Sequence, residues 1–409
     1  MTSPGSETDS EAGTETLADG AAVGEAKRVM VVGPSDYFLS GLTVYTCRMA
    51  NALADLHHVS VLLLERLLPR RFYPGGARVG ELGSSLRYRP EVFEMGRLNW
   101  YWFPQIRRIA KAMRREQPEV VVFQWWTAAV LHTYVLLAWL ARRNRATVII
   151  EFHEVQDTGE VGVPLVSAYA RRVLPRLIAM ASGAIVHSEH DLAELRSTFG
   201  AEVMDSLAIQ IVPHGPYDHL TAPETPAAVE EDDEQDRAVT RLLFFGLIRP
   251  YKGLEDLIDA FNSLSTEQAQ RFRLTVVGET WEGWTRPAEM IECSPHRDRI
   301  NFINRYVADT EIPGFFADAD ALVLPYRRGS SSGPLHIAMS AGLHCVLYAV
   351  GGLVEAVDGY DGAHLVTPDS IEGLRTALLE VGVNRAQRFD DPHSWSGMAV
   401  AINDLVAHG

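Results

Sequence analysis

The sequence predicts an α/β protein built from two doubly wound domains, each with a parallel sheet. The chain has 409 residues, which is too long for one ordinary domain and suits two domains with separate cores. Short β-branched runs alternate with turns and helical stretches, and this pattern occurs twice along the chain. The runs show little polar alternation, which is typical of parallel strands covered by helices on both faces.

The first half of the chain predicts a sheet that starts close to the N-terminus. A strand is expected at 28–32, and a helix at 42–56 follows Gly33 and a polar loop. The apolar run at 125–141 contains polar interruptions and is slightly short for a membrane span, so we expect a buried helix there. Further strands are expected at 59–64, 120–123, 147–152, 184–187 and 209–212.

The second half repeats the alternation after a break. Residues 221–238 contain two prolines and an acidic run, which indicates a solvated linker. An amphipathic helix is expected after the first strand that follows, because five apolar residues recur at helical spacing. These residues are Leu254, Leu257, Ile258, Phe261 and Leu264. Strands are expected at 241–245, 274–277, 300–303, 321–324, 345–349 and 364–366.

Charge and cysteine content exclude several classes of protein. Residues 1–26 carry six acids and no base and lack the apolar segment of a signal peptide, so we expect a disordered acidic tail. The net charge of −16 argues against nucleic acid as a partner. Cys47, Cys293 and Cys345 are scattered, which indicates neither a disulfide framework nor a metal site. We therefore expect a reducing compartment, the cytoplasm.

One candidate anion site is the stretch FGLIRPYKG at 245–253. It follows a strand and opens a helix, and Gly246 allows a tight turn there. Arg249 and Lys252 place two cations beside the start of the helix, where backbone amides and the helix dipole already favour anions. The pattern predicts a diphosphate site, and the alternative is a solvated turn with exposed bases.

A second candidate is the stretch RRGSSSGPLH at 327–336, which follows the strand that ends at Leu324. Gly333 and Pro334 are expected to be the N-cap and first residue of a helix at 334–341. Such a helix would direct its free amides to the carboxyl edge of the sheet, where α/β proteins bind ligands. The alternative is a flexible surface loop. The serines of this turn are Ser330, Ser331 and Ser332.

The ordered set of motifs resembles the retaining glycosyltransferases of family 4. The motifs begin with Ser40-Gly41 and continue with SGAIVHSEHDLAEL at 182–195 and VPHGPYDHL at 212–220. FFGLIRPYKGLEDLIDAF at 244–261 and LTVVGE at 274–279 follow. The second half closes with DADALVLPYRRGSSSGPLHIAMSAG at 318–342 and AVGGLVEAVDGYDGAHLVTP at 349–368. The resemblance runs from about residue 28 to near the C-terminus.

The resemblance implies the GT-B fold, in which two Rossmann-like domains face a central cleft. The N-terminal domain, expected at 27–220, would bind the acceptor, and the C-terminal domain, expected at 239–392, would bind a nucleotide sugar. The stretch at 390–398 resembles the crossover that returns the C-terminus to the first domain. A C-terminal helix at 393–409 would therefore join the N-terminal domain.

The resemblance also assigns roles to single residues. Lys252 matches the family's phosphate-binding lysine, and His153 resembles its cleft histidine near the transferred sugar, although a packed core histidine is the alternative. Leu247 stands where the family carries an arginine, so Arg249 is the candidate for that role. Donor binding is expected at Gly246, Ser330, Ser331, Ser332, Gly333, Leu335 and His336. Acceptor binding is expected at Ser40 and Gly41.

One departure from the family pattern concerns the donor site. The family usually carries two glutamates separated by seven residues, and Gly329 and Ile337 occupy those places here. The second glutamate normally accepts hydrogen bonds from the ribose hydroxyls. His336 or the serines are candidates to replace it, while Glu355 is retained at a different position.

The expected activity is that of a hexosyltransferase that moves a sugar from a nucleoside-diphosphate sugar to an acceptor hydroxyl with retention. No metal and no cofactor are expected, and the nucleotide sugar is the co-substrate. The absent glutamate pair keeps open a catalytically silent GT-B protein that acts as partner or activator of another transferase. A sugar-nucleotide epimerase on a related fold is a third alternative.

The acceptor side of the sequence contains a basic, aromatic stretch at 99–117. One apolar stripe runs along its expected helix and consists of Ile106, Ile109, Ala110 and Met113. Such a helix fits a peripheral contact with an anionic membrane at its inner face, as in transferases with lipid acceptors. An ordinary surface helix packed on the sheet is the alternative.

Overall fold

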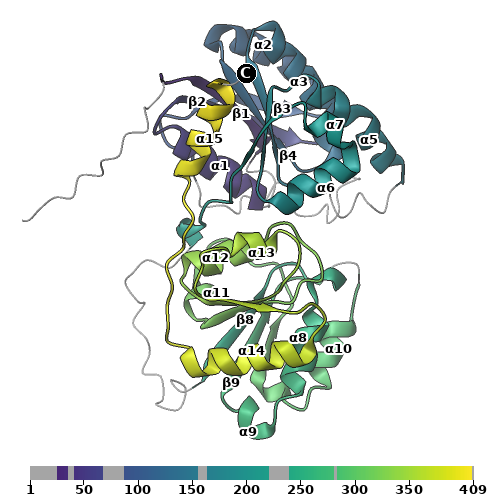
Figure 1. Ribbon diagram of the computed structural model, residues 1–409, viewed down its shortest axis with the longest axis vertical. Helices are drawn as coiled ribbons and strands as arrows, with labels where there is room; N and C mark the ends of the chain where they lie inside the picture. Colours follow the sequence, from purple (N-terminus) through teal and green to yellow (C-terminus); the bar gives the residue numbers. More distant parts are fainter. Residues whose placement is uncertain are drawn as a thin grey trace, which may run out of the picture.

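The computed structural model describes residues 25–35, 41–67, 87–154, 164–220, 239–280 and 283–407. Two α/β units follow one another along the chain, and each contains one parallel sheet with helices on both faces (Figure 1). Nearly all of the expected acidic tail, Ser40 and the whole of the expected linker lie outside the described residues. No described helix combines the length and the apolar character that crossing a membrane requires.

The first sheet has seven strands in the order β3-β2-β1-β4-β5-β6-β7, and every pair is parallel. Its central strands are buried except at their first residues in β1 and β5, as their largely apolar runs predict. The strands are β1 (Arg28–Pro34), β2 (His58–Arg66), β3 (Phe93–Asn99), β4 (Val120–Trp125), β5 (Thr147–Phe152), β6 (Gly183–Val186) and β7 (Ala208–Ile211).

Helices connect these strands and bury their apolar stripes against the sheet. They are α1 (Gly41–Leu53), α2 (Gln105–Glu116), α3 (Leu131–Arg143), α5 (Pro164–Ile178), α6 (Glu189–Phe199) and α7 (Ala201–Met204). The stripe of α2 belongs to the core, because Ile109 and Met113 are buried in it.

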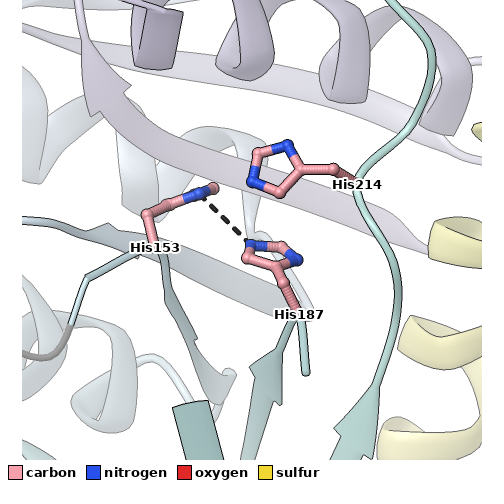
Figure 2. Close-up of side chains that lie close together, drawn as sticks. All are labelled: His153, His187 and His214. Atoms are coloured by element: carbon pink, nitrogen blue, oxygen red, sulfur yellow. Dashed lines mark hydrogen bonds between the residues drawn. The ribbon is translucent and has the colours of Figure 1, made fainter. Parts of the chain in front are cut away.

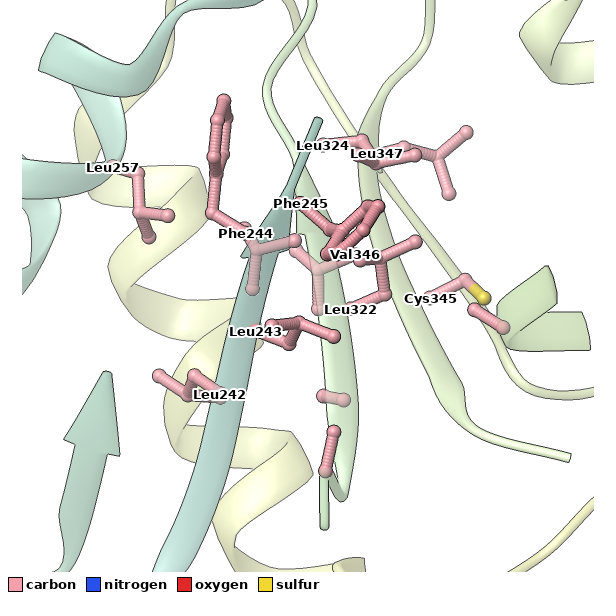
Figure 3. Packing of buried hydrophobic residues seen from close by; sticks show 14 of the residues in the cluster. Leu242, Leu243, Phe244, Phe245, Leu257, Leu322, Leu324, Cys345, Val346 and Leu347 are labelled. Atoms are coloured by element: carbon pink, nitrogen blue, oxygen red, sulfur yellow. The ribbon is translucent and has the colours of Figure 1, made fainter. Parts of the chain in front are cut away.

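The second sheet has six parallel strands in the order β10-β9-β8-β11-β12-β13. Figure 3 shows the apolar side chains of β8, β11 and β12 packed together with Leu257 of α8. The strands are β8 (Thr240–Phe245), β9 (Phe272–Val277), β10 (Ile300–Ile303), β11 (Ala321–Leu324), β12 (His344–Tyr348) and β13 (Ala363–Val366). The helices are α8 (Leu254–Asn262), α9 (Thr266–Ala269), α10 (Arg286–Glu292), α11 (Ile312–Ala317), α12 (Gly333–Ser340), α13 (Leu353–Ala356) and α14 (Ile371–Asn384).

The last helix returns to the first unit. From α14 the chain runs back to α15 (Ser396–Ala407), which lies beside α1 (Figure 1) and also contacts β6 and β7. Trp395, just before α15, donates its indole N–H to the carbonyl of Pro216 at 3.0 Å. Gly215 fits under this ring only because it lacks a side chain, since a Cβ there would lie 2.4 Å from the indole.

Two local predictions are wrong. The apolar run at 125–141 is not one helix: Trp125 ends β4, and the side chain of Thr127 accepts from the amide of Ala129 before α3 begins. Edge strand β3 was not expected. Its sequence FEMGRLN mixes polar and apolar residues and only Leu98 and Asn99 are buried, so it lacks the apolar run of a central strand.

Candidate active site

The carboxyl ends of the two sheets face each other. Glu355, in α13 after β12, accepts hydrogen bonds from the backbone amides of Glu189 and His190 at 2.6 and 2.9 Å. These amides belong to the first turn of α6, which follows β6 of the other sheet. His336, in α12 after β11, stacks on His214 after β7 with ring centroids 5.1 Å apart. The segments that follow the strands of both sheets therefore form one shared surface, the place where ligands bind α/β sheets.

The turn after β8 holds Lys252 at this surface. Gly246 has φ +113°, a conformation that residues with side chains rarely adopt, and a Cβ on it would lie 3.2 Å from the Lys252 ammonium. The ammonium lies 4.9 Å from the ring centre of Tyr326. Burial is the largest cause that lowers the pKa of Lys252, and the neighbouring charge of Arg249 lowers it as well.

Lys252 lacks the counter-ion that a half-buried cation usually has. Within the described part of the chain, no carboxylate forms an ion pair with its ammonium. By contrast, Arg327 contacts Asp256 at 2.5 Å and donates to the carbonyl of Pro250 at 2.9 Å. Arg327 thus holds the lysine turn in place.

The serine turn lies against the lysine turn. Pro334 is 3.6 Å from the position of a Cβ on Gly246, so it flanks the same glycine as the Lys252 ammonium. Ser332, and not Gly333 as the sequence suggested, is the N-cap of α12, because its extended backbone precedes the helix and Gly333 is already helical. A Cβ on Gly352 would lie 2.3 Å from the carbonyl oxygen of Ser330 and 3.0 Å from the hydroxyl of Ser188. The turn therefore lies where the two units meet.

A histidine from each of three neighbouring strand ends forms a cluster. His153, His187 and His214 follow β5, β6 and β7, and all three are buried (Figure 2). Nε2 of His187 lies 3.2 Å from Nδ1 of His153, and the rings of His187 and His214 are 4.2 Å apart. Burial lowers the pKa of each: that of His187 falls to about 4. The cluster is therefore neutral at pH 7.

A buried carboxylate lies beneath the cluster. Glu151, on β5, accepts hydrogen bonds from the hydroxyl of Tyr45 and from the amide nitrogen of Gln124. Burial raises the pKa of Glu151 to about 7, and the two hydrogen bonds oppose that shift. Gln124 also contacts His153, with its side-chain oxygen 2.5 Å from Nε2 of that ring. The side chain of Gln124 therefore links the carboxylate to the histidine cluster.

The structure brings together most of the residues that the sequence singled out. Arg249 and Lys252 lie close together beside Gly246 and the serine turn. His153 and His336 belong to one group of rings through His214. The side chain of Leu335 is buried in the core of the second unit, so only its backbone can face a ligand.

The remaining candidates have other surroundings. The carbonyl of Gly41 accepts from the hydroxyl of Tyr217 at 3.3 Å, and Ser40 is outside the described residues. Ile337 is buried in the apolar core, and Gly329 lies beside Leu353 and Tyr326. Neither of these last two positions offers a carboxylate to a donor.

Sequence reasoning missed four members of the site: Tyr45, Glu151, His187 and His214. A signal for two of them was present, because His187 follows β6 directly, as His153 follows β5, and His214 stands three residues after the end of β7. In a parallel sheet such positions lie at one edge. Tyr45 lies on α1 and Glu151 inside a strand, and no local pattern distinguishes them from core residues.

Comparisons with known proteins match both units. The family described as "Glycosyl transferase 4-like domain" matches residues 40–215, and "Glycosyl transferases group 1" matches residues 239–382. A GDP-mannose:glycolipid 4-beta-D-mannosyltransferase of Xanthomonas campestris pv. campestris is 35% identical over 100 residues, 24% of this chain and 28% of that protein. The O-antigen chain mannosyltransferase B of Escherichia coli is 26% identical over 140 residues, 34% of this chain and 35% of that protein. Each match thus spans only about a quarter to a third of the relative's own length.

Solved structures match over nearly the whole chain. Sucrose-phosphate synthase from Thermosynechococcus elongatus superposes with a TM-score of 0.63 at 17% identity and covers 93% of this chain and 98% of its own. Anabaena HepE in complex with UDP-glucose superposes with a TM-score of 0.59 at 16% identity, with the same two coverages. At these identities the likeness establishes the fold.

Proposed function

The chain belongs to the glycosyltransferases, of the family-4 type with the GT-B fold, and on that premise we propose that it transfers a sugar from a nucleoside-diphosphate sugar to an acceptor hydroxyl. The donor diphosphate binds between the lysine turn and the serine turn, and the acceptor binds beside the histidine cluster. The observation that carries this proposal is the Lys252 ammonium, a half-buried cation without a carboxylate partner in the described chain. A diphosphate supplies the missing negative charge.

The departing diphosphate gains negative charge in the transition state, and three groups are positioned to stabilise it. Lys252 and Arg249 supply fixed positive charge, and the first amides of α12 supply oriented hydrogen-bond donors. These groups neutralise the leaving group without a metal ion. As the family resemblance implies, we propose retention of configuration, with the leaving phosphate helping to deprotonate the acceptor. The anomeric one-bond carbon–hydrogen coupling of the product, read by NMR, tests retention.

GDP-mannose and a glycolipid are the first donor and acceptor to test. The two relatives described above are named as mannosyltransferases, and one name includes GDP-mannose and a glycolipid. Other donors form the comparison panel, because Anabaena HepE was solved with UDP-glucose. A thermal-shift screen with GDP-, UDP-, ADP- and dTDP-sugars would identify the donor as the compound that raises the melting temperature most.

The decisive variant is Lys252→Ala. We expect turnover to fall by about 10²-fold or more, because fixed positive charge at the leaving group is lost while the fold is retained. Release of the nucleoside diphosphate measures turnover, and Lys27→Ala, at the residue just before β1, is the matched control. Near-normal turnover of Lys252→Ala would sink the proposed role of this residue.

The same measurements separate the enzyme from a catalytically silent partner protein. The enzyme releases nucleoside diphosphate in the presence of acceptor. A silent protein that has lost donor binding shows neither thermal stabilisation by any nucleotide sugar nor release of diphosphate. The retained lysine turn supports the enzyme, because its unpaired charge has no use in a protein that does not bind an anion.

A lipid acceptor also fits the outer surface next to α2. The aromatic side chains of Trp100, Tyr101 and Phe103 are 38%, 45% and 62% exposed, directly before this basic helix. Exposed aromatic rings beside lysine and arginine are typical of surfaces that rest on anionic membranes. We propose that this surface contacts the membrane that holds the acceptor, while the buried stripe of α2 packs on the sheet.

Vesicle flotation tests the membrane contact. At low salt, we expect flotation with phosphatidylglycerol vesicles and much less with phosphatidylcholine vesicles. Phe103→Ser should reduce the floated fraction several-fold, because an exposed aromatic ring is lost. Leu165→Ser is the matched control, since Leu165 is 84% exposed at the start of α5. If the wild-type protein stays at the bottom of the gradient with both lipids, the membrane contact is excluded, whereas the transferase proposal stands.

A further inference from the structure

Two pairs of histidines in the described chain have ring nitrogens within hydrogen-bond distance: His344 with His364, and His153 with His187. With Glu151 ionised, only in the first pair can the hydrogens of two neutral rings complete the hydrogen bonds. In the second unit, His344 donates from Nε2 to the carbonyl of Asn384 at 3.0 Å, so its Nδ1 is an acceptor. Nε2 of His364 lies 3.0 Å from that nitrogen and donates to it. Both hydrogen bonds therefore have one donor and one acceptor, and the two rings of this pair are neutral imidazoles.

In the first unit, the pair of His153 and His187 has a different arrangement of hydrogens. Nδ1 of His187 lies 2.9 Å from the carbonyl oxygen of Val212, and a carbonyl can only accept. The hydrogen of the neutral ring is therefore on Nδ1, and Nε2 carries a lone pair. This lone pair faces Nδ1 of His153 at 3.2 Å.

The partners of His153 fix its hydrogen as well. The carboxylate of Glu151 accepts from the amide nitrogen of Gln124, so the amide oxygen of Gln124 faces His153. That oxygen accepts from Nε2 of His153, which leaves a second lone pair on Nδ1. With Glu151 ionised, two lone pairs thus face each other at 3.2 Å in a buried site, and a cation between them would stabilise this arrangement.

A third imidazole and a carboxylate complete the group. His214 offers a ring nitrogen within 4.8 Å of those of His153 and His187, and its buried Nδ1 has no hydrogen-bond partner in the described chain. Oε1 of Glu151 lies 3.8 Å from Nε2 of His187 and supplies negative charge nearby. We propose that His153, His187 and His214 bind one transition-metal dication such as Zn²⁺.

The geometry favours zinc over magnesium. Zinc binds imidazole nitrogen at about 2.0–2.1 Å in a tetrahedral arrangement, which places two ligand nitrogens about 3.3 Å apart. The distance between the nitrogens of His153 and His187 is 3.2 Å. Imidazole ligands suit zinc, copper and nickel, whereas magnesium requires oxygen. His214 lies on the segment after β7, so a side-chain rotation there can close the third bond (Figure 2).

This metal site is separate from the proposed diphosphate site. The ligands belong to the first sheet, whereas Lys252 and the serine turn belong to the second unit. The argument uses only hydrogen positions and distances, so it does not depend on the transferase function. Without a metal ion, a proton on Glu151, with the amide of Gln124 reversed and the hydrogen of His153 on Nδ1, completes the hydrogen bonds with neutral rings.

Metal titration of the untagged full chain tests the site. After dialysis against EDTA and its removal, Zn²⁺ is added in competition with a chromogenic chelator. We expect one ion per chain with a Kd below micromolar, and Co²⁺ in its place should give the visible absorption of a tetrahedral site. His187→Asn and His214→Ala should each weaken binding by at least tenfold. Melting curves confirm that the variants fold, and His214→Ala is the milder change because His214 follows the last strand of the sheet.

His364→Asn is the matched control, because it alters the satisfied histidine pair and should leave zinc affinity unchanged. The proposal is overturned if the wild-type chain binds no stoichiometric Zn²⁺, which would mean that a proton occupies the gap. It is equally overturned if folded His187→Asn and His214→Ala bind Zn²⁺ as tightly as the wild type. Neither result changes the Lys252→Ala test, so the failure of the metal site and the failure of the transferase proposal are distinguishable.

Discussion

The two sides of the shared surface have opposite electrostatic character. On the second unit, Lys252 presents a positive charge without a carboxylate partner in the described chain, beside the first turn of α12. On the first unit, His153, His187 and His214 are neutral rings above the buried carboxyl group of Glu151. One side is therefore suited to an anion, and the other to a neutral hydroxyl or to a metal cation. Similar sheets thus provide different chemistry through the few residues that follow their strands.

The largest loss of stability should come from a backbone change on the side that is suited to an anion, in the second unit. Gly253 has φ +64° and precedes α8, and a Cβ there would lie 2.0 Å from the carbonyl oxygen of Pro325. We expect Gly253→Ala to lower the free energy of unfolding by about 3 kcal/mol and to displace the lysine turn. Urea denaturation measures the first effect, and Gly314→Ala is the control, because a Cβ on Gly314 meets nothing within 4 Å. Equal stability of the two variants would contradict this account of the turn.

The neutral side should make the protein sensitive to acid. Burial lowers the pKa of His187 to about 4 and that of His336 to about 3. Between pH 7.5 and 5.5 the unfolded chain takes up protons at these rings and the folded chain does not, so the free energy of unfolding falls. Each ring should contribute about 1 kcal/mol to that loss. Glu151, whose pKa is raised to about 7, opposes it by taking up a proton in the folded state.

Urea denaturation at both pH values, with EDTA present, checks this expectation. His336→Asn should show a smaller loss of stability between pH 7.5 and 5.5 than the wild type, by about 1 kcal/mol. His364→Asn should differ less from the wild type, since His364 is only partly buried. If His336→Asn shows the same pH dependence as the wild type, the ring of His336 is not held neutral in the folded protein.

The smallest effect is expected for a change at Glu355, which links the two units. Glu355 accepts from two amides at the start of α6, where the helix dipole favours a negative charge. We expect Glu355→Gln to weaken the attraction between the two units by about 1 kcal/mol. The KM for the donor should then rise several-fold, and the melting temperature should stay nearly unchanged. Small-angle scattering should show a larger radius of gyration, and Glu380→Gln on α14 is the control. An unchanged KM and radius would mean that Glu355 does not hold the units together.

The amino-acid sequence alone determined the two parallel sheets. Largely apolar runs such as 147–152 and 321–324 match their strands residue for residue, because burial on both faces favours apolar side chains. Local chemistry also indicated the anion side, since Gly246, Lys252 and the serine turn lie next to strand ends and helix starts. Edge strand β3 escaped detection, because a partly exposed strand needs no apolar run.

The tertiary structure alone decided how the histidines meet. Consecutive members of the set His153, His187, His214 and His336 are 27 to 122 residues apart in sequence. Only the parallel order of β5, β6 and β7 and the contact between the units bring their rings together. The protonation of these rings depends on Val212, Gln124 and burial, which no local pattern reveals. Strands follow from the hydrophobicity of nearby residues, whereas hydrogen positions and pKa values follow from neighbours that are distant in the chain.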